Sequence, residues 1–267
     1  VDMLFVKGNI GSTGDFLLGS RLIGAFSLPT NTTAAQGATG DYKYDYMNGA
    51  ATPVNTDANE ISWMFRRASK FMDIVCYAGN TVSGHTIDHN LGVVPEMMIT
   101  KTRTAGYTRG WAVYHKDVYP SGDMSLMLNT DQAETAEGVF YPTTPTATSY
   151  TLGIDANVNN AANTYIAYLW ATLAGVSKVG SYTADATLTT INCGFSAGAR
   201  FILIKRFDAV GNWYLYDSLR GIVAGNDPYL LLNENAAQVT GTDYIDPDNS
   251  GFQITAAGSS TINVDTG

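Results

Sequence analysis

The strongest constraint on the fold of this chain is an internal repeat of about 105 residues. Tyr182 follows Tyr77 by 105 positions, and the apolar runs around the two tyrosines come in the same order. Further matched landmarks are Ile61 and Ile166, Lys101 and Lys205, Asn129 and Asn233, and Tyr150 and Phe252. The run at 3–7, "MLFVK", matches "EMMITK" at 96–101 and "RFILIK" at 200–205, which indicates a third, partial copy. Because order and spacing persist together, we interpret the chain as tandem modules.

Each module is predicted to consist of short strands. The three matched runs are continuously apolar, as expected for strands buried on both faces, whereas "WAVYH" and "WYLYD" alternate like half-buried strands. Turn signals such as "AGN", "HNLG" and "DPDNSG" separate them. A helix is an alternative for "ISWMFRRASKF", but its repeat partner "IAYLWATLAGV" alternates aromatic residues and favours a strand. The sequence therefore predicts an all-β fold of tandem β-sandwich, jelly-roll-like repeats of about 100 residues.

The repeat also predicts module boundaries. We expect a partial first repeat at 1–69 without its N-terminal strands, a complete central repeat at 70–173, and a third repeat at 174–267 that lacks its last strand. A sandwich without one strand leaves unpaired backbone groups beside an open apolar face. We therefore expect the third repeat to be completed from outside. The donor would be a continuation of the chain, a neighbouring subunit, or the first segment "VDMLFVKG" joining head to tail.

Composition excludes several classes of protein. Hydrophobic residues make up 45% and charged residues 15% of the chain, so it is not a disordered polymer. The net charge of −9 argues against a nucleic-acid-binding groove, which needs a basic stripe. No apolar stretch reaches the roughly 18 residues of a membrane span. Cys76 and Cys193 fall at different places in the repeat, and we interpret them as free thiols.

A resemblance adds to this interpretation. "SWMFRRASKFMDIVCYAGN…HTIDHNLGVVPEMMITKTR…WAVYH" and "GARFILIKR…GNWYLYDSLRGIVAGNDPYLLLN" resemble a repeat of structural proteins of tailed, especially marine, phages. In that family the repeat accompanies tail-fibre and other appendage proteins, often beside laminin-G-like domains. The resemblance covers residues 60–267. It implies a location in the virion and assembly with copies of itself and other virion proteins, and it assigns no catalytic residue.

Two segments invite a metal-site interpretation, and we predict a turn for each. His85, Asp88 and His89 lie in "HTIDHN", but extended residues four apart are separated by about 13 Å, so we expect a solvated turn. "DPDNSG" at 246–251 begins like a calcium loop, yet Ala257 occupies the position of its bidentate glutamate. We therefore predict no metal and no cofactor.

Aromatic residues divide into two groups. Trp111 and Trp213 occupy one repeat position, and repeated bulk at one position predicts a repeated core. We expect tyrosines in irregular segments that differ between the copies to be exposed, which makes them better candidates for recognition of a glycan or receptor. They are Tyr42, Tyr44, Tyr46, Tyr107 and Tyr119.

The basic cluster of Arg66, Arg67 and Lys70 has no basic counterpart in the next copy. We interpret it as a solvated edge that discourages strand pairing. Contact with an acidic neighbouring subunit is the alternative.

Three functions are compatible with these patterns. The first is a non-enzymatic virion structural protein that assembles by β-sheet contacts. The alternative is a carbohydrate- or receptor-binding β-sandwich of a phage or of a secreted bacterial adhesin at the cell surface. The third, a glycan depolymerase, needs two carboxylates about 5 to 9.5 Å apart, and no such pair stands out. We therefore predict that the chain is not an enzyme.

Overall fold

The computed structural model describes residues 1–38, 42–44, 49–50, 59–118, 124–136, 138–140 and 143–263. Within them the regular structure is nearly all β, with two short 3-10 helices, η1 (Arg21–Ile23) and η3 (Ala256–Ser260). The strands are β1 (Met3–Lys7), β2 (Phe16–Ser20), β3 (Phe26–Pro29), β4 (Gly37–Ala38), β5 (Ile61–Phe65), β6 (Met72–Ala78), β7 (His85–Asp88), β8 (Met97–Thr102), β9 (Ala112–His115), β10 (Met124–Met127), β11 (Thr135–Ala136), β12 (Ser149–Leu152), β13 (Thr164–Trp170), β14 (Thr189–Asn192), β15 (Phe201–Lys205), β16 (Trp213–Asp217), β17 (Leu230–Leu231), β18 (Ile245–Asp248) and β19 (Gly251–Ile254). The predicted all-β class is confirmed.

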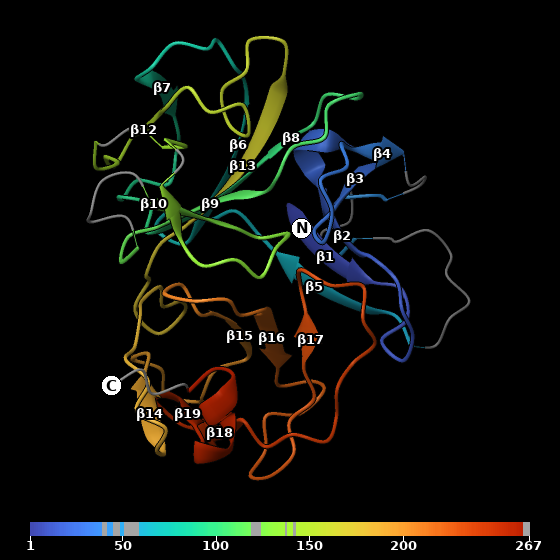
Figure 1. The fold of residues 1–267 in the computed structure, drawn as a ribbon, viewed down its shortest axis with the longest axis vertical. Coiled ribbons are helices and arrows are strands. Elements are labelled where there is room, and N and C mark those ends of the chain that lie inside the picture. The colour runs from blue at the N-terminus through green and yellow to red at the C-terminus, as the bar shows by residue number, and fades with distance from the viewer. Residues whose placement is uncertain are drawn as a thin grey trace.

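Three antiparallel sheets form the inner layer of the molecule. Their strand orders are β4-β3-β2-β1-β5, β11-β10-β9-β8-β13-β6 and β15-β16-β17. Two small sheets, β12-β7 and β14-β19-β18, lie outside the second and third inner sheets (Figure 1). Each of these pairs encloses an apolar core of its own, as in a β-sandwich.

All three inner sheets also share one large core. Phe16 and Leu18 of the first sheet, Trp111 beside the second, and Trp213 and Leu215 of the third belong to a single buried cluster. The three inner sheets lie around this cluster (Figure 1), so that one face of each contributes to the same core.

The inner sheets begin in the same way. β1, β8 and β15 each pair with the next strand in the chain, and that strand pairs with the one after it. The carbonyls of Phe16, Trp111 and Trp213 each accept a backbone N–H from the segment that follows, at 2.9 Å in all three cases. These matching contacts support the repeat interpretation. β5 and β13 then cover the second edges of β1 and β8, respectively.

Two expectations about local structure and strand donation are wrong. The segment "VDMLFVKG" contains β1, which pairs with β2 on one edge and β5 on the other, so it is not available to join head to tail. "HTIDHN" is a strand and not a solvated turn, because His85–Asp88 forms β7 and pairs with β12. No helix in the described ranges is long and apolar enough to cross a membrane.

Candidate functional site

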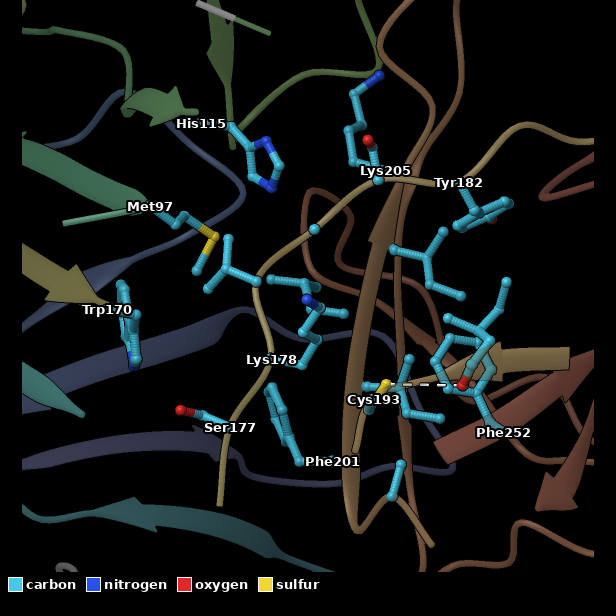
Figure 2. A pocket seen from close by; sticks show the side chains of 18 of the residues that line it. Met97, His115, Trp170, Ser177, Lys178, Tyr182, Cys193, Phe201, Lys205 and Phe252 are labelled. Atoms are coloured by element: carbon cyan, nitrogen blue, oxygen red, sulfur yellow. Dashed lines mark hydrogen bonds between the residues drawn. The ribbon is translucent and has the colours of Figure 1, made fainter. Parts of the chain in front are cut away.

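A cavity of about 730 Å³ lies beside the open edge of β15. On its other edge β15 pairs with β16, and it has no second neighbour in the described part of the chain. Residues 177–183 line the cavity together with β15. Figure 2 shows Met97 and Trp170, from β8 and β13, on one side of the cavity, and Cys193 and Phe252 on the other. We refer to this cavity as the β15 groove.

The central module shows what is missing at the β15 groove. There β13 lies between β8 and β6 and runs antiparallel to both, so that Tyr168 stands opposite Ile99 on one side and Ile74 on the other. In the repeat, β15 corresponds to β8 and residues 177–183 correspond to β6. No described strand takes the place of β13 between them.

Side-chain contacts support this correspondence. The Tyr77 hydroxyl donates to the Val158 carbonyl at 2.9 Å, and the Tyr182 hydroxyl donates to the Ile262 carbonyl at 2.7 Å. The next residue in the chain is an asparagine in both cases, Asn159 and Asn263. Each asparagine accepts one backbone N–H through Oδ1 and donates through Nδ2 to two carbonyls. The loops that flank β13 and the β15 groove are thus built alike.

The lack of a neighbour leaves β15 more exposed than β8. Lys101 and Ile99 of β8 are fully buried, whereas the matching Lys205 and Leu203 of β15 are half-buried. Each strand is paired on its other edge, β8 with β9 and β15 with β16, so the lower burial of β15 reflects the absence of a neighbour in the position of β13.

The charges at one end of the site are reversed between the modules. Asp73 and Glu96 flank the end of β13 in the central module, and Lys178 and Arg200 occupy the matching positions in the third. Both cations are exposed and line the β15 groove. The groove is therefore largely apolar, with Lys178 and Arg200 exposed at one end, while Lys205 and Arg206, which also line it, are bonded to backbone carbonyls and to Asp208, respectively.

Comparison with known families gives one result. A family model described as Domain of unknown function (DUF7483) matches residues 25–266. The chain belongs to this family. No curated protein and no solved structure matches it. The DUF7483 match includes β15 and residues 177–183, so both segments that flank the β15 groove lie inside the family domain.

Three equivalent lysines of this DUF7483 chain donate to backbone carbonyls. Lys7 bonds to Gly14, Lys101 bonds to Arg109, and Lys205 bonds to two loop carbonyls at 2.6 and 3.2 Å. Burial lowers the pKa of Lys7, and it lowers the pKa of Lys101 to about 7 and of Lys205 to about 8. These contacts hold loops against strands and therefore fit a structural role.

Trp111 and Trp213 are buried, as predicted. Their backbone N–H groups donate to Asn129 and Asn233, respectively, at 2.7 and 2.9 Å. Each indole donates to a carbonyl at the end of a strand in the preceding inner sheet, β3 for Trp111 and β10 for Trp213. The tryptophans thus connect successive modules of the DUF7483 chain and are not available as glycan platforms.

The structure contradicts the expected exposure of two of the tyrosine candidates. Tyr42 and Tyr44 are buried and pack against Leu4 and Val6 of β1, so the prediction that they are exposed is wrong. Tyr107 is half-buried in a loop. Tyr46 and Tyr119 lie outside the described residues.

The basic cluster divides in two. The Arg67 guanidinium pairs with Asp73 at 2.6 Å, and the backbone N–H of Arg67 donates to Asp2 at 2.9 Å. Arg67 is therefore engaged within the chain. Arg66 and Lys70 are exposed, as a solvated edge requires, and remain candidates for subunit contact.

The histidines and the aspartate-rich segment make local contacts. His85 Nδ1 lies 3.1 Å from the Asn159 side-chain oxygen, and His89 Nδ1 accepts the Leu91 N–H at 3.2 Å. The turn prediction for "DPDNSG" is correct only for Asn249 and Ser250, because Asp246–Asp248 belong to β18 and Gly251 begins β19; Asp248 accepts the N–H and hydroxyl of Ser250. In the described ranges no group of three or more His, Cys, Asp or Glu is arranged to hold a metal.

The sequence predicted a missing strand but did not show that residues outside the third repeat also line the groove. Met97 and Trp170 belong to the central module, and nothing in the order of the runs shows that they face the third. The continuously apolar sequence of β13 was a usable signal, because it indicates a strand buried on both faces. The position of its counterpart in the third repeat should therefore have apolar residues on both sides.

Proposed function

We propose that this DUF7483 chain is a non-enzymatic structural module of a tailed-phage virion, in a tail fibre or similar appendage, and that it assembles with its neighbours through β-sheet contacts. The observation that carries the proposal is the open edge of β15 beside an apolar groove. An exposed strand edge is a template for pairing with another chain, and natural proteins normally cover or blunt it. An edge that lies in an apolar groove is suited to assembly.

The use of buried polar side chains supports the same function. Lys7, Lys101, Asn159 and Asn263 bind backbone carbonyls of loops and strands, and the two tryptophan indoles tie one inner sheet to the next. Interactions of this kind make a rigid body from three modules. A rigid β-rich body with one open edge serves a fibre or shaft better than it serves a catalyst, which needs polar groups directed at a substrate.

The proposed location in the virion rests on the resemblance of residues 60–267 to repeats of phage appendage proteins. The test is to raise antibodies against the purified chain and to label purified particles of the phage that encodes it. Gold particles clustered on tail fibres or on another appendage, together with peptides of the chain in the particle proteome, are expected. Particles that contain no such peptides would show that the virion assignment is wrong.

A further inference from the structure

We propose that the β15 groove accepts one extended strand donated by a second polypeptide, and that this strand pairs antiparallel with β15. The proposal rests on the proposed assembly function and names the chemistry of the partner. Addition of a strand to an open edge gives affinity through backbone hydrogen bonds and specificity through alternate side-chain pockets.

The groove is shaped for a strand that is apolar on both faces. Phe201 and Leu203 of β15 turn toward the large shared core, whereas Ile202 and Ile204 turn toward the core of the third sandwich. Figure 2 shows the same two walls, with Trp170 on the shared-core side and Phe252 on the other. A strand beside β15 would direct alternate side chains toward these two walls.

The central module supplies the register. In β13, Tyr168 and Trp170 lie opposite Ile99 and Met97 and enter the shared core, while Leu169 enters the second sandwich. The donated strand should likewise place large aromatic residues opposite Leu203 and Phe201 of β15. It should place smaller aliphatic residues opposite Ile202 and Ile204.

Charge defines the end of the donated strand. In the central module β13 ends beside Glu96, which accepts the backbone N–H of Thr172 at 2.7 Å. Arg200 occupies the position of Glu96 in the third module, and exposed Lys178 lies on the opposite wall. An acidic residue directly after the apolar strand would meet both cations. The partner is thus an apolar strand with an acidic C-terminal flank.

The described strands of this chain do not supply the donor. The long apolar strands β1, β8 and β13 each pair on both edges within the chain. Within the described residues no strand is free to fill the groove, and the donor in our proposal is a second polypeptide.

The experiment uses the 267-residue chain and a fluorescent peptide with the sequence of Asn163–Trp170 followed by Asp-Glu. Binding is measured by fluorescence anisotropy, and hydrogen exchange maps the protected amides. We expect protection of β15, and about tenfold or greater weakening when the peptide isoleucine that corresponds to Ile166, whose backbone faces β8 in the central module, is replaced by proline, which removes a ladder donor to β15.

Protein variants test the site itself. Leu203→Glu in the groove should weaken binding about tenfold or more, whereas Leu219→Glu, at a residue that is 85% exposed and does not line the groove, should leave it unchanged. Circular dichroism checks that both variants fold. The double variant Lys178→Glu/Arg200→Glu should prefer a peptide that ends in Lys-Lys over the original peptide.

Several results would overturn the proposal. They include equal binding of the proline peptide, an unchanged affinity of the Leu203→Glu variant, or protection confined to other strands. Self-association of the chain that Leu203→Glu abolishes would show that a second copy is the occupant. Binding that appears only after deletion of residues 264–267 would show that the end of the chain itself fills the groove. Failure of the virion labelling with successful peptide binding would refute the location and leave the groove assignment standing.

Discussion

Lys101 offers the sharpest test of how the buried polar residues contribute to stability. Its side chain is fully buried, its ammonium group donates to the Arg109 carbonyl, and it lies 5.6 Å from the centre of the Trp111 ring. Burial lowers its pKa from 10.5 to about 7. The perturbation we consider is Lys101→Met, which keeps an unbranched apolar stem and removes the charge.

The sign and size of the effect follow from proton linkage. Above pH 7 the folded chain releases the Lys101 proton, whereas the unfolded chain keeps it up to about pH 10.5. Because the unfolded state then binds more protons, the free energy of unfolding should rise with pH, by up to about 1.4 kcal/mol per pH unit. Between pH 7 and pH 9 the contribution of Lys101 is about 2–3 kcal/mol. Lys101→Met should remove this rise.

The assay is urea unfolding at pH 7, 8 and 9, followed by tryptophan fluorescence. The difference between wild type and Lys101→Met should widen in favour of wild type as the pH rises. Lys70→Met is the matched control, because Lys70 is exposed and its replacement should give a curve parallel to that of wild type. Parallel curves for wild type and Lys101→Met would refute the reasoning, since they would mean that Lys101 has the same protonation in both states.

Two further predictions concern the core and the acidic side of the third module. Trp111→Ala and Trp213→Ala should each lower the free energy of unfolding by about 3–5 kcal/mol in urea titrations, and a loss below about 1 kcal/mol would contradict their place in the shared core. Burial, with Asp243 and Asp246 nearby, raises the pKa of fully buried Asp227 from 3.8 to about 6. Since the folded state then binds more protons, this group should add up to about 3 kcal/mol of stability as the pH falls from 7 to 4, a gain that Asp227→Asn should lack in the same titration.

The strand content was predictable because short apolar runs and turn residues encode it locally. β1, β8 and β15 were each expected as strands, and the turn expected at "DPDNSG" occurs at Asn249 and Ser250, between β18 and β19. The shared core was not predictable. It depends on contacts between segments far apart in the chain, such as the indole of Trp111 with the Pro29 carbonyl, and no local pattern specifies which faces meet.

The error at Tyr42 and Tyr44 has a physical reason. Both lie in an irregular segment, which suggested exposure, but "MLFVK" had already been interpreted as a strand buried on both faces. The outer face of β1 therefore needed a cover, and the two tyrosines pack there against Leu4 and Val6. Since β1 was expected to be buried on both faces, the sequence could have predicted that nearby aromatic residues such as Tyr42 and Tyr44 cover its outer face.

The sequence offered the N-terminal segment, which contains β1, as one possible strand donor to another copy. Met3, Leu4, Phe5 and Val6 are all buried, and burial of such a side chain contributes about 1.5–3 kcal/mol. Together the four contribute about 6–12 kcal/mol, which is comparable to the whole stability of a typical domain. Release of β1 would also leave the paired edges of β2 and β5 open. Deletion of residues 1–7 should therefore unfold the first inner sheet and the shared core, seen as loss of near-ultraviolet circular dichroism and of the cooperative urea transition. A deletion variant that unfolds cooperatively at nearly the wild-type urea concentration would show that β1 is dispensable, and would restore it as a candidate donor for the β15 groove.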